Sequence, residues 1–530
     1  MKLKGFKFFR VVVLFSIVIN VSCLRKEKFN KVVVEDWETS LAVPIVNSRL
    51  TIKDIAYRIH DLDESVHEHS DGSFTFIYRD TVRFPNAEDF IEIPSLSFST
   101  AFDLGPDQPL LLPAGQTATA TYSEEYQLEF ENGERIRQVN FKGGLLVVSL
   151  SSGYNHHTEV DITFPGLQKN GIPYSDKINL SPYGRATRGM NLDGYQLSME
   201  SGSRANVIAY TTEFKLTSSG NPIGPGGEIQ FSFSMNEPKY SRLYGNFGQI
   251  DFDPMEGTVD IEVFEGTIDG HVFLEDPKIF LTTTNSFGVP SGFKLDNMVS
   301  EANEIHTNLT ASFIPGPNQI NYPVSEGQGK VYSHFNADKS NSNIRDIFVP
   351  APMRLHYKAG FSIGSASGND WFVKDNSHME LYVRAEVPLY GSLHLYALRD
   401  TVHDIELPAR ENAEYVKLKI KVDNGMPTKL GLQGYWLDAY NNVIEPLFIA
   451  PHDIILSGDI NSEGELVNPA VQYTELEYDA GQYDKISRAR KLVLTGNFQT
   501  GNGSQSVKFF SQNYVQIQIS ILAKARITIE

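Results

Sequence analysis

The chain has 530 residues with a single cysteine, and its 46 Lys and Arg against 65 Asp and Glu give a formal charge of −19. This length exceeds one ordinary domain, and 41% hydrophobic residues can build folded cores, which excludes a globally disordered chain. The acidic balance argues against a nonspecific nucleic-acid binder. One cysteine excludes a disulfide framework and a multi-cysteine zinc or iron–sulfur site.

The first 23 residues have the pattern of a lipoprotein signal peptide. The first ten positions carry basic residues and no acid, Val11–Val21 is an apolar run of 11 residues, and Cys23 follows. The run is too short to span a bilayer, which takes about 20 apolar residues. Removal of the signal peptide, 1–22, would leave Cys23 as the lipidation site, although Asn20 stands where such signals usually have leucine. The alternative is a plain secreted protein with an incidental cysteine.

Hydrophobic and polar residues alternate along most of the remaining chain. In chain order, Thr51–Arg58 has helical spacing, Glu228–Met235 and Lys417–Val422 alternate with period two, Ile486–Val493 has helical spacing, and Val515–Ile521 alternates again. Period two is typical of half-buried strands, and Gly and Pro interrupt these runs at the spacing of sandwiches. We therefore expect an all-β protein of tandem immunoglobulin-like antiparallel β-sandwiches with a few short helices.

A strand–turn–strand unit occurs three times. Strands end at Ser152, Asn285 and Asn424, which are 133 and 139 residues apart, and a turn with Gly or Pro and a second strand follow each of them. Chance similarity between strands is the alternative to a repeat. The spacing predicts domains of similar size. The expected organisation is a tether at 23–45 and sandwiches at 46–215, 216–380 and 381–530.

Several segments resemble known proteins. Asp36–Asn47 (DWETSLAVPIVN), Glu386–Gly391 (EVPLYG) and the strand-turn K-V-D-N-G-M-P resemble large, mostly uncharacterised outer-membrane lipoproteins of the Bacteroidota. The strand–turn–strand units, with N-S-F-G-V-P and N-G-M-P in their turns, resemble β-sandwich domains of the late-embryogenesis-abundant type. Neither resemblance includes a catalytic motif, so neither implies an enzymatic activity.

The first resemblance implies attachment to the outer membrane through a lipid anchor on Cys23. In the Bacteroidota an acidic run after the cysteine often directs lipoproteins to the cell surface, but Leu24–Phe29 is basic apart from Glu27. The periplasmic and cell-surface faces therefore both remain open. The expected partner is an integral β-barrel protein, and we expect no nucleic acid and no cofactor.

Two three-residue segments match a short O-glycosylation signal known from Bacteroidota envelope proteins, which is Asp, then Ser or Thr, then an aliphatic residue. They are Asp80–Val82 and Asp400–Val402, and each follows an alternating strand. The candidate modified residues are Thr81 and Thr401. The alternative is a turn in which the aspartate caps the backbone.

Other candidate sites are weighed against structural roles. Trp371 follows a polar loop and could stack on a sugar ring, although most aromatic residues of β-sandwiches pack in cores. His67 and His69, and separately Asp251 and Asp253, are weak candidates for a metal ion, for which metal-free loops are the alternative and our expectation.

One motif fits a hydrolase pattern. Gly360–Gly364 has the form G-x-S-x-G, but no alternation of strands and helices surrounds it, and the alternative is a loop between strands. No catalytic residue is therefore assigned. The leading hypothesis is a non-enzymatic, lipid-anchored envelope scaffold or binding protein that presents sandwich loops to another outer-membrane component. The alternatives are a glycan-binding lipoprotein of a polysaccharide uptake system and, third, a hydrolase.

Overall fold

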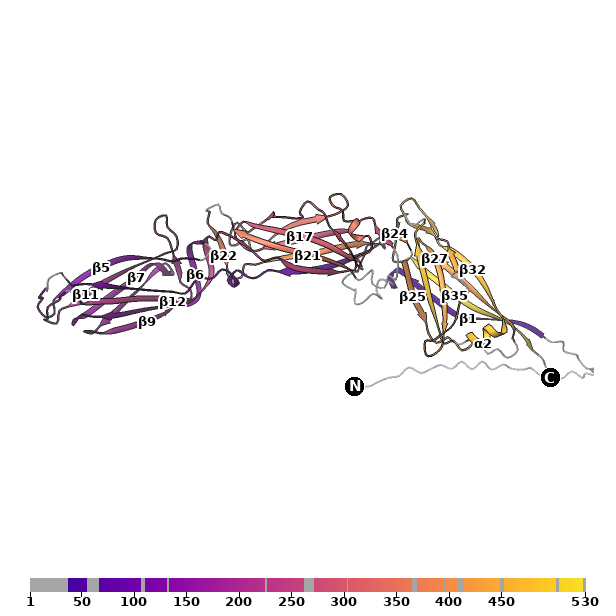
Figure 1. Ribbon diagram of the computed structural model, residues 1–530, viewed down its shortest axis with the longest axis horizontal. Coiled ribbons are helices and arrows are strands. Elements are labelled where there is room, and N and C mark those ends of the chain that lie inside the picture. The colour runs from indigo at the N-terminus through magenta and orange to yellow at the C-terminus, as the bar shows by residue number, and fades with distance from the viewer. Residues whose placement is uncertain are drawn as a thin grey trace, which may run out of the picture.

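The computed structural model describes residues 37–54, 66–105, 110–130, 133–224, 226–261, 271–302, 304–364, 369–394, 396–405, 407, 413–448, 452–501 and 505–527. Cys23 and the predicted signal peptide lie outside these ranges. The described residues are almost entirely β-strands with antiparallel pairing, so the expected all-β sandwich class is confirmed. The strands form three lobes in a row, which we name the tip, middle and base lobes (Figure 1, left to right).

The base lobe is a sandwich of two sheets. Its first sheet has the order β1 (Trp37–Thr51), β35 (Tyr514–Ile527), β26 (Ala413–Asn424), β32 (Ala470–Tyr478). Its second sheet has the order β25 (Tyr396–Val402), β33 (Lys491–Gln499), β27 (Lys429–Leu437), β28 (Val443–Pro446), with β29 (His452–Ile455) also on β27. The hairpin β30 (Asp459–Ile460) and β31 (Leu466–Asn468) and the helix α2 (Ala480–Ile486) complete it.

The middle lobe has the same two-layer construction. Its first sheet has the order β2 (Val66–Glu68), β3 (Phe74–Arg83), β23 (Met379–Pro388), β16 (Lys278–Asn285), β20 (Val331–Ala337). In its second sheet, β21 (Arg354–Gly364) pairs with β17 (Ser291–Ala302). The other edge of β21 pairs with β13 (Gln249–Asp251) and β14 (Met255–Asp260), and β17 also pairs with β18 (Ile305–Asn308) and β19 (Asn318–Ile320). The short 3₁₀ helix η4 (Asp346–Phe348) packs beside it.

In the tip lobe one continuous sheet folds into two layers, and the first layer has the order β4 (Leu96–Asp103), β12 (Glu228–Asn246), β6 (Arg135–Ser152), β9 (Arg185–Asn191). The other has the order β5 (Thr117–Gln127), β11 (Val207–Thr217), β7 (His157–Lys169), β8 (Ile172–Leu180). The short strand β10 (Gln196–Ser198) pairs with β6 and β7 and joins the two layers. β22 (Trp371–Lys374) adds to β12 where the tip lobe meets the middle lobe.

The lobes are nested in the sequence rather than consecutive. β1 pairs with β35 in the base lobe, and β3 pairs with β23 in the middle lobe. The middle lobe is therefore inserted between β1 and β25, and the tip lobe is inserted between β3 and β13. Strands from the two sides of the expected boundaries at 215 and 380 pair within the same sheets. Residues 37–45, which were expected to belong to the tether, form part of a strand. Periodicity marks a strand but not its partner, so the boundaries placed on consecutive segments were wrong.

The three lobes share one order of strands. The three series are β4-β12-β6-β9, β3-β23-β16-β20 and β1-β35-β26-β32, and each places a strand from the start of a lobe beside a strand from its end. Ser152, Asn285 and Asn424 end the third strand of each series. Each side-chain oxygen accepts a hydrogen bond from the backbone N–H two residues on, at 3.2, 2.8 and 3.1 Å. One side-chain-capped turn thus leads from the first sheet to the second in every lobe.

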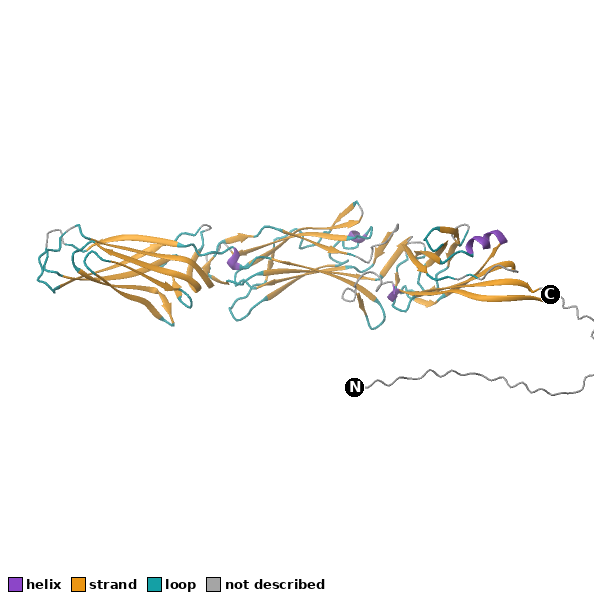
Figure 2. Cartoon of the chain, turned by 90° about the horizontal axis from the view of Figure 1, so that it is seen from below, coloured by secondary structure: helices purple, strands orange, loops and turns teal. Residues whose placement is uncertain are grey.

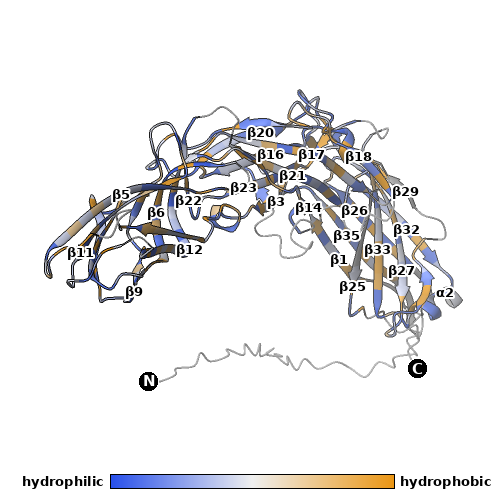
Figure 3. Ribbon diagram, turned by 60° about the vertical axis from the view of Figure 1, so that its left-hand side comes forward, coloured by the Kyte–Doolittle hydropathy of each residue, from blue (hydrophilic) through white to orange (hydrophobic). Residues whose placement is uncertain are grey.

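Alternation decides which face of each strand is buried. In β12, Ile229, Phe231, Phe233 and Met235 are buried while the residues between them face outward. The same alternation runs along strands throughout the molecule (Figure 3). The tip and middle lobes share one continuous hydrophobic core, and the base lobe has a second.

Helices are few and short, as expected, but one lies elsewhere than predicted. Asp479 caps α2 by accepting from the Gln482 N–H at 2.8 Å, so the helix begins at Ala480 and ends at Ile486. Lys491–Gln499 is a central strand between β25 and β27, so the helical spacing of Ile486–Val493 was misleading. Residues 52–54 are helical, and the rest of the Thr51–Arg58 prediction lies outside the described residues. Within the described part of the chain, helices long and apolar enough to cross a bilayer are lacking.

Candidate functional site

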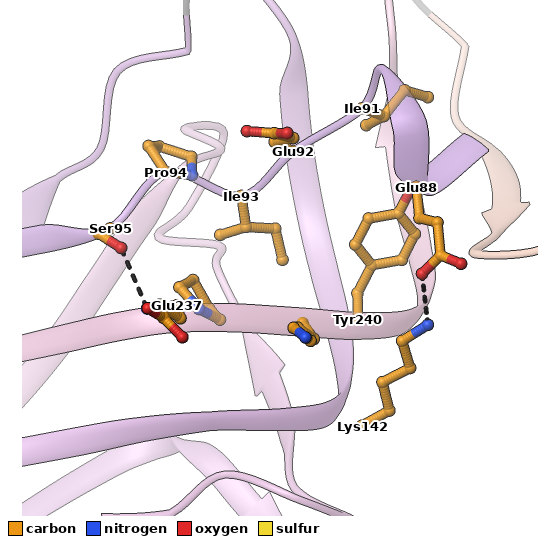
Figure 4. A pocket seen from close by; sticks show the side chains of 11 residues that line it. Glu88, Ile91, Glu92, Ile93, Pro94, Ser95, Lys142, Glu237 and Tyr240 are labelled. Atoms are coloured by element: carbon orange, nitrogen blue, oxygen red, sulfur yellow. Dashed lines mark hydrogen bonds and ion pairs between the residues drawn. The ribbon is translucent and has the colours of Figure 1, made fainter. Parts of the chain in front are cut away.

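A hollow of about 500 Å³ lies where the tip lobe meets the middle lobe (Figure 4). The connection between β3 and β4 forms one side, and β6 and β12 form the other. It is lined by Glu88, Ile91, Glu92, Ile93, Pro94, Ser95, Lys142, Glu237, Pro238, Lys239 and Tyr240. Because the connection carries the chain from one lobe into the other, this hollow belongs to both.

A bulge in β12 shapes the hollow. The register of β12 against β6 shifts between Asn236 and Lys239 and again on either side of Tyr240, and Glu237 has a φ of +47°. The bulge fits because Gly144, with a φ of +113°, faces it: a Cβ there would lie 2.8 Å from the Pro238 Cα. The Glu237 N–H donates a hydrogen bond to the Ser95 Oγ at 3.0 Å, which attaches the bulge to the connection.

Lys142 ties three segments together beside the hollow. Its Nζ lies 2.6 Å from a Glu88 oxygen and 2.7 Å from an Asp375 oxygen. Glu88 belongs to the 3₁₀ helix η2 (Ala87–Asp89), and Asp375 follows β22. The hydrogen bonds to Asp375 and Glu88 raise the pKa of the Lys142 ammonium, so it stays charged.

Tyr240 supplies a buried hydroxyl next to these charges. The side chain is buried, and its hydroxyl has no hydrogen-bond partner among the described residues. Burial raises the pKa of the Tyr240 hydroxyl, and the carboxylates of Asp375 and Glu88 raise it further. The group therefore remains a neutral phenol that can donate or accept a hydrogen bond.

The lining residues do not form a nucleophile–base pair. They include neither cysteine nor histidine, and Ser95 and Tyr240 are their only hydroxyl side chains. The lining includes three glutamates and two lysines, and Lys142 pairs with Glu88 across two segments. The arrangement can bind a small polar group or hold the two lobes together, but it lacks the parts of a hydrolase site.

The middle and base lobes are held by a different carboxylate. Glu275 accepts hydrogen bonds from Arg345 of the middle lobe and from Ser506 of the base lobe, each at 2.6 Å. Beside it, β15 (His271–Leu274), β24 (Tyr390–His394) and β34 (Val507–Lys508) form a small sheet across the junction. Both junctions are therefore built from specific polar contacts rather than open linkers.

The structure places the predicted modification and binding residues as follows. Thr81 lies exposed in β3 and Thr401 half-buried in β25, so both occupy strands rather than turns. The Asp80 Oδ1 accepts a hydrogen bond from the Thr81 backbone N–H at 2.7 Å, and its Oδ2 accepts one from the Tyr357 hydroxyl at 2.7 Å. Trp371 is half-buried in β22 and packs against the core shared by the tip and middle lobes.

The weak metal candidates remain separate pairs. The His67 and His69 rings stack edge to face with centroids 4.6 Å apart, and the His69 Nε2 lies 2.9 Å from the Thr75 hydroxyl. Asp251 and Asp253 are exposed, and Asp251 accepts a hydrogen bond from Gln249. Among the described residues, acids, histidines and cysteines form no group of three or more that could hold a metal ion.

The G-x-S-x-G segment Gly360–Gly364 lies inside β21, paired with β13 on one side and β17 on the other. It is neither the strained strand-to-helix turn of a hydrolase nor the loop expected as the alternative.

Sequence reasoning did not find the Glu380 cluster on the first sheet of the middle lobe. Glu380 is 8% exposed, and its carboxylate accepts from the Tyr382 hydroxyl at 2.8 Å and from the Lys330 ammonium at 3.1 Å. Alternation along Met379–Pro388 places Glu380, Tyr382 and Arg384 on one face, which is a signal that the sequence contains. The sequence does not show which residues of the neighbouring strands contact these three side chains.

The sequence matches no protein-family model and no curated protein. Among solved structures, a candidate secreted protein from Parabacteroides distasonis aligns with 53% of this chain and 89% of its own, at 12% identity and a TM-score of 0.30. A triple jelly-roll protein of an archaeal virus aligns over 82% and 90% at 10% identity and a TM-score of 0.11. The VP2 subviral particle of infectious bursal disease virus aligns over 82% and 81% at 10% identity and a TM-score of 0.14. These likenesses carry no functional argument.

Proposed function

We propose that the protein is a non-enzymatic, lipid-anchored rod of the outer membrane that presents its tip lobe to another envelope component. The observation that carries the proposal is where the first and the last described strands, β1 and β35, begin and end. Trp37 of β1 lies opposite Ile527 of β35, at the outer end of the base lobe and far from the tip lobe (Figure 2). A lipid on Cys23 would therefore put the base lobe next to the membrane.

Chain length limits how far the base lobe can stand from the bilayer. Between Cys23 and Trp37 lie 36 − 23 = 13 residues. At full extension they would reach about 45 Å, so the base lobe stays close to the surface. The nested insertions then make the tip lobe the most distant part of the rod. The junction contacts of Lys142 and Glu275 support a stiff rod, because they hold neighbouring lobes in one arrangement.

The loops at the far end of the tip lobe suit a protein partner. Leu111 is 67% exposed and Tyr183 is 64% exposed. Buried contacts hold these loops: the Tyr154 hydroxyl donates to Asp103 at 2.8 Å and accepts from the Leu104 N–H at 2.6 Å, and the Tyr183 N–H donates to the Tyr154 carbonyl at 2.9 Å. Exposed apolar side chains on an ordered support are typical of interface anchors.

Two experiments test the proposal. Cys23→Ala should move the protein from the detergent-extracted membrane fraction into the soluble fraction. A photo-crosslinker at position 183 should capture one outer-membrane protein, and Leu111→Asp should abolish that product. The matched control is a crosslinker at Tyr440 of the base lobe, which at 85% exposed is even more accessible than Tyr183. Retention of the Cys23→Ala variant in membranes, or equal crosslinking from both positions, would contradict the proposal.

A further inference from the structure

The outward face of the first middle-lobe sheet combines cations with exposed tyrosine rings. Alternation turns every second residue of β3, β23, β16 and β20 outward, and the register sets them in rows across the sheet. One row runs from Tyr332 to Arg83 through Glu380, the next holds Tyr382 and Thr81, and the third holds Arg384 and Arg79. We name this surface the Tyr332–Arg79 face.

Its charge is opposite to that of the chain. Arg79, Arg83, Arg384 and the adjoining Lys330 against Glu380 give 4 − 1 = +3, whereas the whole chain carries −19. The next row adds Lys278 and Glu386, which cancel, and Asp276 lies 2.9 Å from the Lys278 ammonium, so the positive excess is confined to the three rows named above. Charges beyond about 8 Å are screened at physiological salt, so an approaching ligand meets the local +3 rather than the global negative charge.

Two groups of this face, Tyr382 and Arg384, are held in place before any ligand arrives. Tyr332 is 54% exposed and Tyr382 is 39% exposed, and the Tyr382 hydroxyl is fixed by its hydrogen bond to Glu380. The Arg384 guanidinium lies 4.5 Å above the Phe280 ring centroid and 3.3 Å from Glu386. Groups ordered in advance lose little conformational freedom on binding.

We propose that the Tyr332–Arg79 face binds a linear anionic polysaccharide that carries carboxylates. Guanidinium groups match carboxylates in a bidentate geometry, and exposed tyrosine rings offer flat apolar surfaces for the C–H faces of sugar rings. Arg79 and Arg83 lie four residues apart on one strand, or about 13 Å, so a polymer with regularly spaced charges can meet both. Each exposed ion pair contributes little alone, and a polymer gains by engaging several together.

Other occupants fit the face less well. A membrane-binding face needs apolar side chains that enter the lipid, and a protein anchor site needs a buried apolar centre. Among the described residues of this face, Tyr332 and Tyr382 are the only large hydrophobic side chains that are exposed. This proposal does not depend on the lipid anchor or on the tip-lobe partner. Its failure would therefore leave the proposed function unaffected.

One earlier candidate lies in the middle of this face. Thr81 is exposed between Arg79 and Arg83. A sugar attached to Thr81 would cover the face and block the polymer. The binding experiment therefore uses full-length protein from a host that leaves Thr81 unmodified, as verified by mass spectrometry.

The test measures binding of the full chain, in a non-ionic detergent, to polygalacturonate at physiological salt. Wild type should bind, affinity should fall as salt rises, and uncharged dextran should not compete. Arg83→Gln with Arg384→Gln should weaken binding about tenfold or more. The matched control is Arg185→Gln with Arg188→Gln, which removes two exposed arginines from β9 of the tip lobe and should leave binding unchanged.

A second pair of variants separates ring stacking from folding. Tyr332→Ala should weaken binding about tenfold, while Tyr332→Phe keeps the ring and should stay within about twofold. All variants should melt within a few degrees of wild type. No binding by wild type, equal loss in the β9 control, equal binding to dextran, or binding to anionic vesicles in place of the polysaccharide would each overturn the proposal.

Discussion

The Tyr357 hydroxyl donates a hydrogen bond to the Asp80 Oδ2 at 2.7 Å, joining residues that are 277 positions apart. Asp80 lies in β3, before the inserted tip lobe, and Tyr357 lies in β21, after it. The Tyr357 ring crosses over Gly257, where a Cβ would be 2.2 Å from the ring. The bond therefore connects the two sheets of the middle lobe. Burial raises the pKa of the Tyr357 hydroxyl, and Asp80 raises it further, so the hydroxyl remains a donor.

Tyr357→Phe should destabilise the middle lobe by about 1–3 kcal/mol, because it leaves the Asp80 carboxylate without this donor in a partly buried place. Urea unfolding would measure the change. The matched control is Tyr332→Phe, which removes an exposed hydroxyl from the opposite side of the same lobe and should change stability by less than about 0.5 kcal/mol. Equal stability of the two variants would show that the Asp80–Tyr357 bond contributes nothing.

Thermal unfolding should show two transitions, because the base lobe has its own core and the tip and middle lobes share another. Asn424→Ala should lower the base-lobe transition alone. The Asn424 side chain is fully buried, donates to the carbonyls of Thr428 at 2.7 Å and Leu456 at 3.2 Å, and accepts from the Met426 N–H. Losing these bonds should cost about 1–3 kcal/mol for each group left unpaired.

Asn285→Ala is the matched variant for the other core, since Asn285 occupies the equivalent turn of the middle lobe. It should lower the tip–middle transition and leave the base-lobe transition in place. Calorimetry separates the two transitions, and in a Trp371→Phe background the fluorescence of Trp436, which is buried in the base-lobe core, identifies the base-lobe transition. A single transition that both variants shift equally would contradict the two-core description.

Acid should weaken the first sheet of the middle lobe through Glu380. Burial acts to raise the pKa of this carboxyl, but the hydrogen bonds from Tyr382 and Lys330 outweigh it and hold the pKa below its ordinary 4.5. A carboxyl whose pKa is lowered by folding stabilises the protein above its ordinary pKa. The contribution is lost as pH falls through the folded-state value.

Glu380→Gln should therefore lower stability at pH 7 and flatten its decline between pH 6 and pH 3. Tyr382→Phe removes one donor and keeps the carboxylate, so the folded-state pKa of Glu380 should rise toward its ordinary value and the decline should be smaller than in wild type. Urea unfolding across this range would measure both. A Glu380→Gln variant with the wild-type acid profile would show that another group causes the decline.

Glu275→Ala should loosen the junction between the middle and base lobes, because Arg345 and Ser506 then lose their shared acceptor. Distances between spin labels on the two lobes should become more broadly distributed. The control is Glu256→Ala, which removes a carboxylate 3.6 Å from Lys358 within the middle lobe and should leave the distances unchanged. Unchanged distances in the Glu275→Ala variant would show that the small sheet of β15, β24 and β34 holds the junction by itself.

Part of this architecture could be predicted from local pattern. The alternation in Glu228–Met235 predicts a strand with one buried face, and the structure confirms it in β12. The turns at Ser152, Asn285 and Asn424 could be found because Ser and Asn oxygens cap a turn through neighbouring residues. Local pattern failed at Ile486–Val493, where helical spacing of apolar residues coincides with a central strand whose burial depends on β25 and β27.

The sequence by itself determined the strand class, the acidic charge and the single cysteine at position 23, because each depends on residue identity or on spacing over a few residues. Only the tertiary structure decided that Thr51 lies opposite Tyr514, that Asp80 meets Tyr357, and that a cationic face stands on an acidic chain. Pairing between distant strands depends on which exposed edges and apolar faces meet when the whole chain packs. The free energy of the assembled sheets determines which strands pair, and the hydrophobic periodicity of a single strand does not identify its partner.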